Sequence, residues 1–358
     1  MHTGIQTTIR GAVFVARRMF GITAEPSWGA LPRRLRPESA PGAPSTREEI
    51  VWGYRALLGR EPESEDMIRG WLGTGWSFEK FRSELIASAE FRTKNPAAFS
   101  YTIQRNVVIK ELDDGPRLFV DLSDVSIGLS ILQGSYEKAE VAFVREHVRE
   151  GDVVVDVGAN IGFFTVLLAA FVGPAGRVFA YEPLPQNTAL LERSIAENRF
   201  EDRVRLRKAV LSDRAGCAEL VWLPLERGSL NSGGSYIRSE GAPVPPGHDV
   251  LPVPMVTLDA EELPGPVRFL KIDVEGAEPL VLRGARETLI RDRPVILAEV
   301  NPVQLAKVSN ETPDGLLGIL KALGYDGMLL WDGKLAGRVD SLPGDEIRTV
   351  VFLPAGAR

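Results

Sequence analysis

The stretch Val153-Val154-Val155-Asp156-Val157-Gly158-Ala159-Asn160-Ile161-Gly162 decides the fold of this chain. Residues 153–157 form a largely apolar run, as expected of a strand buried on both faces of a sheet. Helical spacing of apolar residues follows over 161–171. A glycine-containing turn between a buried strand and a helix is the place where open α/β sheets bind ligands. We therefore expect this turn to be part of a ligand-binding site.

Strands and helices continue to alternate on the C-terminal side of this stretch. Further strands are expected at 177–181, 204–210, 269–272 and 295–300, with helices at 185–198 and between the last two strands. This alternation predicts an α/β fold with a Rossmann-like, doubly wound parallel sheet. After a helix near 316–323, the apolar runs 328–331 and 349–353 are expected to pair as a C-terminal antiparallel hairpin at the sheet edge.

The N-terminal side of the chain is organised differently. Residues 1–23 are an N-terminal segment, and residues 24–46 are rich in proline, as in a linker. Residues 47–97 have helical spacing and predict a small all-α domain. Residues 98–135 are expected to be a connector containing a β-hairpin with strands at 107–110 and 117–120. The α/β domain would then span 136–358.

Charge and composition narrow the class of partner. The net charge of -6 argues against broad nucleic-acid binding, which uses a concentrated basic surface. Cys217 is the only cysteine, which excludes an intramolecular disulfide framework and fits a reducing, cytoplasmic location. No apolar stretch reaches the roughly 18 residues of a membrane span. Residues 1–20 could form an amphipathic helix at a membrane surface, or a helix packed on its own domain.

The turn after the first strand favours a positively charged ligand. Asp156 ends the strand and could accept hydrogen bonds from an ammonium group, while Gly158 and Gly162 allow close approach of the backbone to a ligand. A nicotinamide dinucleotide would need the spacing G-x-G-x-x-G around its pyrophosphate. The carboxylate of Asp156 would repel that pyrophosphate. S-adenosylmethionine has an ammonium and a sulfonium but no phosphate, and is therefore the favoured cofactor.

The ends of the next two strands offer acceptors for the rest of this cofactor. Glu182 could bind both hydroxyls of the ribose, as acidic residues at this position do in nucleotide-binding folds. Ser212 and Asp213 could reach the adenine ring, although an ordinary polar turn would have the same composition.

A second cluster of charged residues lies at the carboxyl end of another buried strand. Lys271, Asp273 and Glu275 belong to it. Asp273 could contact the cofactor ammonium or take a proton from the substrate. Glu275 and Glu278 are further candidates, and one of them could instead cap the following helix. Glu299, near the end of a later strand, faces the same cleft by topology.

The stretch 225–250 is the expected place of acceptor specificity. Residues 228–236 within it are polar and flexible in composition, suited to a lid over a hydroxylated substrate, and Asn231 and Ser232 could bind hydroxyl groups of a sugar. His248 could act as a general base, because an imidazole titrates near neutral pH. An exposed histidine without a catalytic role is the alternative for a position in this proline-rich loop.

With both motifs in view, the chain resembles the FkbM family of S-adenosylmethionine-dependent methyltransferases. The resemblance runs from about Tyr136 to Pro302 and includes residues 134–137, 156–165, 181–183, 209–213, 256–259 and 270–278. It implies O-methylation, often of sugar hydroxyls in glycans and glycolipids or of hydroxyls in secondary metabolites. The candidate cofactor-binding residues that join those named above are Tyr136, Ala159, Asn160, Thr165, Pro183 and Asn187. Separately, residues 54–62 and 88–91 resemble a helical domain of unknown function from bacterial surface-glycan proteins.

The resulting hypothesis is direct displacement at the sulfonium methyl by an acceptor oxygen. Asp273, Glu275 or Glu299 would take the hydroxyl proton as transfer proceeds. A divalent metal could be held by these acids, but the sequence does not require one. The acceptor would be a sugar or glycan-type hydroxyl, and methylation at nitrogen or carbon is not excluded. Two other hypotheses stay open: an inactive scaffold that keeps this fold, and a nicotinamide-dependent oxidoreductase.

Overall fold

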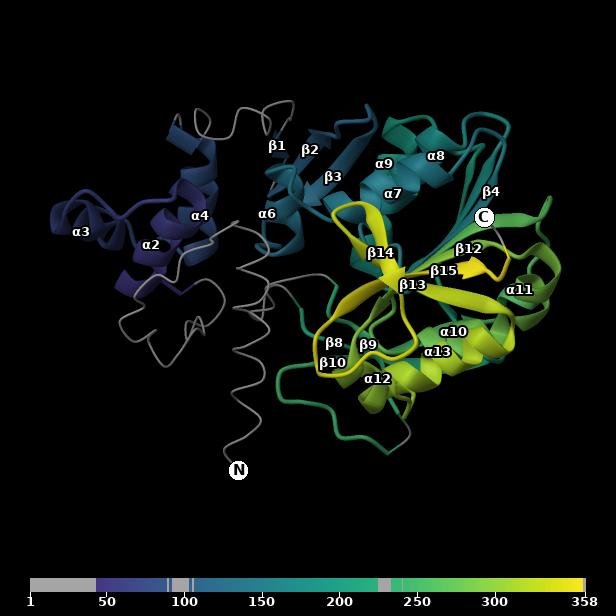
Figure 1. Ribbon diagram of the computed structural model, residues 1–358. Coiled ribbons are helices and arrows are strands. Elements are labelled where there is room, and N and C mark those ends of the chain that lie inside the picture. The colour runs from purple at the N-terminus through teal and green to yellow at the C-terminus, as the bar shows by residue number, and fades with distance from the viewer. Residues whose placement is uncertain are drawn as a thin grey trace. The chain divides into compact units, whose positions relative to one another are not determined.

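The computed structural model describes residues 43–88, 90–91, 103–104, 106–224, 233–239 and 241–356. The chain divides into two compact units (Figure 1). The first contains residues up to 94 together with 129–136, and the second contains 95–128 and 137–358. The expected connector 98–135 is therefore not a separate part, because its first segment groups with the second unit and its last with the first. Residues 1–42 lie outside the described residues, and with them the expected N-terminal segment and most of the expected linker.

The described part of the first unit is helical. It contains α2 (Arg47–Gly53), a π-helical turn (Tyr54–Leu58), α3 (Glu65–Gly73) and α4 (Phe78–Ala87). A capping box formed by Thr46 and Glu49 starts α2, which explains why the helix begins where the sequence changes from proline-rich to acidic. The end of the expected linker is already part of this unit, since the backbone N–H of Ser45 donates to the Trp76 carbonyl over 2.7 Å.

The second unit is built around an eight-stranded sheet with the strand order β14-β13-β15-β12-β11-β4-β5-β6. Strands β4 (Val153–Val157), β5 (Arg177–Tyr181), β6 (Val204–Arg207), β11 (Val267–Ile272) and β12 (Val295–Val300) are parallel. Strand β15 (Arg348–Pro354) is antiparallel to β12 and to β13 (Tyr325–Trp331), which in turn pairs with β14 (Lys334–Arg338). The five parallel strands confirm the predicted α/β sheet.

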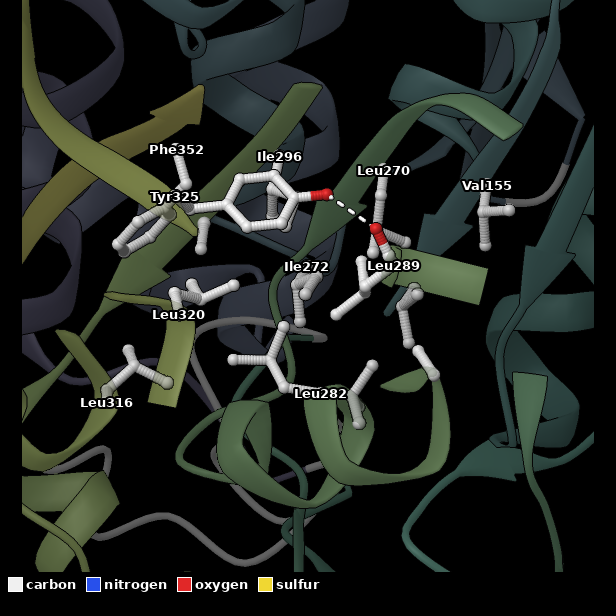
Figure 2. Packing of buried hydrophobic residues seen from close by; sticks show 14 of the residues in the cluster. Val155, Leu270, Ile272, Leu282, Leu289, Ile296, Leu316, Leu320, Tyr325 and Phe352 are labelled. Atoms are coloured by element: carbon white, nitrogen blue, oxygen red, sulfur yellow. Dashed lines mark hydrogen bonds between the residues drawn. The ribbon is translucent and has the colours of Figure 1, made fainter. Parts of the chain in front are cut away.

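Helices cover both faces of this sheet (Figure 1). One face carries α7 (Lys138–His147), α8 (Phe163–Phe171) and α9 (Pro185–Glu197), and the other carries α10 (Glu278–Gly284), α11 (Arg286–Asp292), α12 (Pro302–Val308) and α13 (Pro313–Ala322). Figure 2 shows the core on the second face, where Leu282, Leu289 and Leu320 pack against Ile272 and Ile296 of the sheet. The Tyr325 hydroxyl donates to the Leu289 carbonyl over 3.2 Å (Figure 2). This core holds the strand ends that form the site.

Two smaller sheets accompany the large one. Strands β1 (Ile103–Gln104), β2 (Val107–Glu111) and β3 (Arg117–Asp121) form an antiparallel sheet that contains the expected hairpin. Strands β7 (Val210–Leu211), β10 (Asp249–Val256), β8 (Gly216–Trp222) and β9 (Tyr236–Ile237) form the other, in that order. A short helix, α6 (Ile127–Leu132), precedes α7. In the described ranges, none of the helices has the length and apolar character that a membrane crossing requires.

Two expectations need correction. The runs 328–331 and 349–353 do pair antiparallel, but β14 lies between them in the chain, occupies the edge, and forms the hairpin with β13. The expected strand 204–210 is divided between β6 and β7, which belong to different sheets. Within the stretch 225–250, β9 is a short strand, and β10 begins at the end of the stretch.

Candidate functional site

Polar side chains gather at the carboxyl ends of β4, β5, β11 and β12 in the second unit. In the register of the sheet, Asp156 on β4 lies beside Lys271 on β11. Both side chains point to the α8 face, since Asp156 contacts Thr165 and Lys271 contacts Phe164 of that helix. Parallel strands end at one edge of a sheet, and so residues far apart in the sequence meet here.

The loop after β4 depends on its glycines. Gly158 has a φ of +82°, and a Cβ placed on it would lie 1.8 Å from the carbonyl oxygen of Asp273. The backbone N–H groups of Gly158 and Ala159 both donate to the Tyr181 carbonyl over 3.0 Å. Gly162, with a φ of +97°, precedes α8 and packs against Leu191. Close packing of this loop against β5 and the β11 loop therefore fixes its path.

Asp156 is fully buried and only partly satisfied. Its Oδ2 accepts a hydrogen bond from the Thr165 hydroxyl over 2.6 Å. Its Oδ1 has no hydrogen-bond partner among the described residues. Burial raises the pKa of Asp156, while the Lys271 ammonium and the Thr165 hydrogen bond oppose this rise. A buried acceptor without a partner needs a donor from elsewhere, and a bound ligand can provide it.

Glu182 follows β5 and is held by its surroundings. Its Oε2 accepts from the Asn160 backbone N–H over 2.8 Å, and its Oε1 accepts from the Leu184 N–H over 2.9 Å and from Asn187 Nδ2 over 3.3 Å. Burial raises its pKa to about 7 against these hydrogen bonds. A carboxylate has about four acceptor sites, which leaves capacity for a ligand hydroxyl.

The turn after β7 is tied to its neighbours through the backbone. The Ser212 N–H donates to the Val256 carbonyl over 2.9 Å, and a Cβ on Gly284 would lie 1.9 Å from the Ser212 carbonyl oxygen. Asp213 Oδ1 accepts from the Ser212 hydroxyl over 3.4 Å and forms an ion pair with Arg214. These contacts hold the turn in place, and the expected adenine contacts remain a prediction.

The loop after β11 joins the turn after β4. The Asp273 N–H donates to the Val157 carbonyl over 3.0 Å, and the Asp273 carboxylate is 3.2 Å from the Lys271 ammonium. Lys271 is 5% exposed. Burial alone would lower the pKa of Lys271, but the carboxylates of Asp273, Glu137 and Asp156 together raise it above its usual range.

Two of the acids in this loop have different environments. Glu278 Oε1 accepts from the backbone N–H groups of Val274 and Gly276 over 3.3 and 3.2 Å, and so it binds the loop before α10, whereas no side-chain cap forms at the start of that helix. Burial raises the pKa of Glu278 to about 7. Glu275 has a φ of +51°, a conformation that costs a non-glycine residue energy and occurs preferentially at functional sites.

Glu275 and Glu299 lie near enough to Asp273 for its charge to affect both of them. Burial raises the pKa of both glutamates, and the charge of Asp273 adds to the rise in each. Lys307 opposes it at Glu275, and Lys271 opposes it at Glu299. The structure therefore brings together the three carboxylates expected from the sequence.

Of the expected acceptor-binding residues, His248 is the one within the described residues. Asn231 and Ser232 lie outside the described residues. His248 is in the turn before β10, with its Nδ1 3.3 Å from the Pro246 carbonyl oxygen. No hydrogen bond or ion pair within the described ranges joins it to the carboxylates. Tyr136 belongs to the first unit, and its expected role with the cofactor remains a prediction.

Glu137 is a residue of this site that sequence reasoning missed. It precedes α7 with a left-handed φ of +41°, and its charge contributes to the raised pKa of both Lys271 and Glu299. It lies in the motif 134–137, but its spacing in the sequence gives no sign that it faces β11 and β12.

These residues fit S-adenosylmethionine. The unpartnered Oδ1 of Asp156 can accept from an ammonium group, and Glu182 can accept from ribose hydroxyls. No group of three or more histidine, cysteine, aspartate or glutamate side chains in the described part of the chain is placed to hold a metal ion.

Comparison with known proteins identifies the family. A family model described as the methyltransferase FkbM domain matches residues 156–326. The 31-O-demethyl-FK506 methyltransferase FkbM of Streptomyces tacrolimicus is 31% identical over 199 residues, which cover 49% of this chain and 72% of the relative. The fold and site are those of an S-adenosylmethionine-dependent methyltransferase. The chain belongs to the FkbM family of these enzymes, and S-adenosylmethionine is its cofactor.

Solved structures are similar at low sequence identity. Methyltransferase FkbM from Methylobacillus flagellatus has a TM-score of 0.34 and 17% identity, with 65% of this chain and 55% of that chain covered. Fibrillarin from Aeropyrum pernix, solved with natively bound S-adenosyl-L-methionine, has a TM-score of 0.36 and 15% identity, with 71% of this chain and 97% of that chain covered.

Proposed function

We propose that this protein transfers a methyl group from S-adenosylmethionine to a hydroxyl oxygen of a sugar, a glycan or a glycosylated metabolite. The observation that carries the proposal is the set of carboxylates of Asp273, Glu275 and Glu299 beside the cofactor-binding loops, with the pKa of both glutamates raised. The name of the Streptomyces relative, a 31-O-demethyl-FK506 methyltransferase, supports transfer to oxygen. The sugar class of acceptor rests on the resemblance and on the polar composition of residues 228–236.

The chain's own residues would hold the cofactor at three points. Asp156 would accept from the ammonium through its free Oδ1, Glu182 from the ribose hydroxyls, and Asp213 from the adenine amine. When bound, the cofactor supplies a methyl group on a positively charged sulfur. The loops carrying these acceptors are fixed by backbone hydrogen bonds, so little reorganisation is needed on binding.

We assign the role of general base to Glu299. Burial and the charges of Asp273 and Glu275 raise its pKa well above the usual value, and its ionised carboxylate is therefore a stronger base than an ordinary glutamate. The acceptor hydroxyl would donate its proton to the Glu299 carboxylate as its oxygen bonds to the methyl carbon. Glu275, which raises the pKa of Glu299, would remain protonated for part of the time. Lys271 keeps its proton because its pKa is raised, and so it does not serve as the base.

The test is methyl transfer from a carbon-13-labelled donor to a panel of glycosides, with the position of the methyl group determined by NMR. Glu299→Gln should lower kcat by about 10²–10⁴-fold, the usual contribution of a general base, while the affinity for S-adenosylhomocysteine stays within about threefold. Glu262→Gln is the control, because this glutamate is exposed. Undiminished turnover by Glu299→Gln would remove it from the mechanism. A methyl group found on nitrogen or carbon would overturn the proposed acceptor atom.

Failure of every acceptor would have a separate meaning. A wild-type protein that binds S-adenosylhomocysteine but methylates none of the panel would favour the inactive scaffold. Binding of a nicotinamide dinucleotide in its place would favour the oxidoreductase.

A further inference from the structure

Lys271 is a buried cation inside the cofactor end of the site. Its side chain is 7% exposed, and its Nζ lies 4.8 Å from the centroid of the Phe164 ring. The Asp273 carboxylate, 3.2 Å away, fixes the other side of the ammonium. An ammonium held by an ion pair and an aromatic face is restricted to one position.

Four carboxylates face the single ammonium group of Lys271. Asp156 lies beside it on β4, Asp273 is in the loop after β11, Glu299 is on β12, and Glu137 precedes α7. The α8 helix contributes the Phe164 ring and the Thr165 hydroxyl, which bonds to Asp156. A buried carboxylate without a compensating charge takes up a proton. The charge of Lys271 opposes this at Asp156, which is fully buried.

We propose that Lys271 is a positioning residue that keeps Asp156 ionised, so that the free Oδ1 of Asp156 can bind the ammonium of the cofactor. This inference rests on the proposed cofactor contacts. Asp273 and Phe164 hold the Lys271 ammonium in place. Lys271 would affect cofactor binding through Asp156.

The readout is the preference for S-adenosylhomocysteine over adenosine, measured by calorimetry. Adenosine lacks the amino-acid part but shares the ribose and the adenine, and so effects on Glu182 cancel in the ratio of the two affinities. Lys271→Met should lower this ratio at least tenfold. The loss should be larger at pH 6.0 than at pH 7.5, because Asp156 without its cation is more fully protonated at the lower pH. Lys271→Arg should restore the ratio to within about threefold of wild type.

A double variant tests whether Lys271 acts through Asp156. In the Asp156→Asn background, Lys271→Met should change the ratio by less than threefold, since the group it compensates is gone. This double variant also loses one charge of each sign, which protects the folded state if Lys271→Met alone does not fold. Lys208→Met is the control, because Lys208 pairs with Glu192 on the surface and should leave the ratio unchanged.

The outcomes separate the inference from the proposed function. An unchanged ratio in folded Lys271→Met, or a further tenfold loss in the double variant relative to Asp156→Asn, would overturn the role of Lys271. Absence of S-adenosylhomocysteine binding by the wild type would instead refute the proposed cofactor contacts.

Discussion

At the scale of single residues, the main feature of this site is a set of buried carboxyl groups with raised pKa values. Glu182 and Glu278 have pKa values of about 7 because burial outweighs the hydrogen bonds that favour their charged forms. The two residues differ in purpose. Glu182 lies where a cofactor would bind, whereas Glu278 binds the N–H groups of its own loop. A raised pKa alone therefore does not identify a catalytic residue.

Glu278 makes a testable contribution to the pH dependence of stability. Its folded pKa is about 7 and its usual value is 4.5, so the folded state holds the proton more tightly. The stabilisation is present at pH 4 and is lost as pH rises through 7, which lowers the free energy of unfolding by about 3 kcal/mol. Glu278→Gln should remove most of this decrease in urea unfolding measured between pH 4.5 and pH 8. Exposed Glu201→Gln should keep the decrease, and an equal decrease in both variants would contradict the assignment.

The close contact between two loops defines the site at the scale of elements. The turn after β4 and the loop after β11 meet where Gly158 approaches the Asp273 carbonyl. In the same place, the N–H of Asp273 donates a hydrogen bond to the Val157 carbonyl. A side chain at position 158 would force these loops apart. The position of Asp156 relative to Asp273 therefore depends on Gly158, although this residue has no side chain to contact a substrate.

Gly158→Ala and Gly151→Ala form a matched pair. Both glycines have a left-handed backbone, with φ of +82° and +89°, but only the Cβ at position 158 would meet another atom within 4 Å. Both variants should lose about 1 kcal/mol from the strained backbone. Gly158→Ala should lose about 1–3 kcal/mol more in urea unfolding from the overlap with Asp273, and S-adenosylhomocysteine binding should weaken at least tenfold. Equal losses in both variants would show that the two loops separate at little cost.

The elements that the sequence predicted are those with buried apolar runs. Strands β4, β5, β11 and β12 were expected within one or two residues, because all of them lie inside the parallel sheet. Strand β14 was missed because its residues, Lys334–Arg338, are mostly exposed at the sheet edge and contain no buried apolar run. Strand β10 was missed because Pro252 and Pro254 lack an N–H donor. They are tolerated since β7 pairs only with Met255 and Val256, which leaves one side of the prolines without a strand.

At the scale of the whole molecule, the site could be predicted as far as topology determines it. Asp156, Glu182, Asp273 and Glu299 all follow or end parallel strands, and parallel strands bring their carboxyl ends to one edge. Glu137 precedes a helix, and only the packing of α7 brings its charge to Lys271. The grouping of residues 129–136 with the first unit likewise depends on tertiary contacts that no local pattern records.

The central claim is that the strand ends around Asp156 and Glu182 bind S-adenosylmethionine. Calorimetric titration with S-adenosylhomocysteine tests it most directly, on the wild type, on Glu182→Gln, and on Glu192→Gln as a surface control that pairs with Lys208. We expect micromolar binding by the wild type and the control. Glu182→Gln should bind about 10–100-fold more weakly, as expected for lost hydrogen bonds to a charged group. Equal affinity of Glu182→Gln, or no binding by correctly folded wild-type protein, would contradict the account.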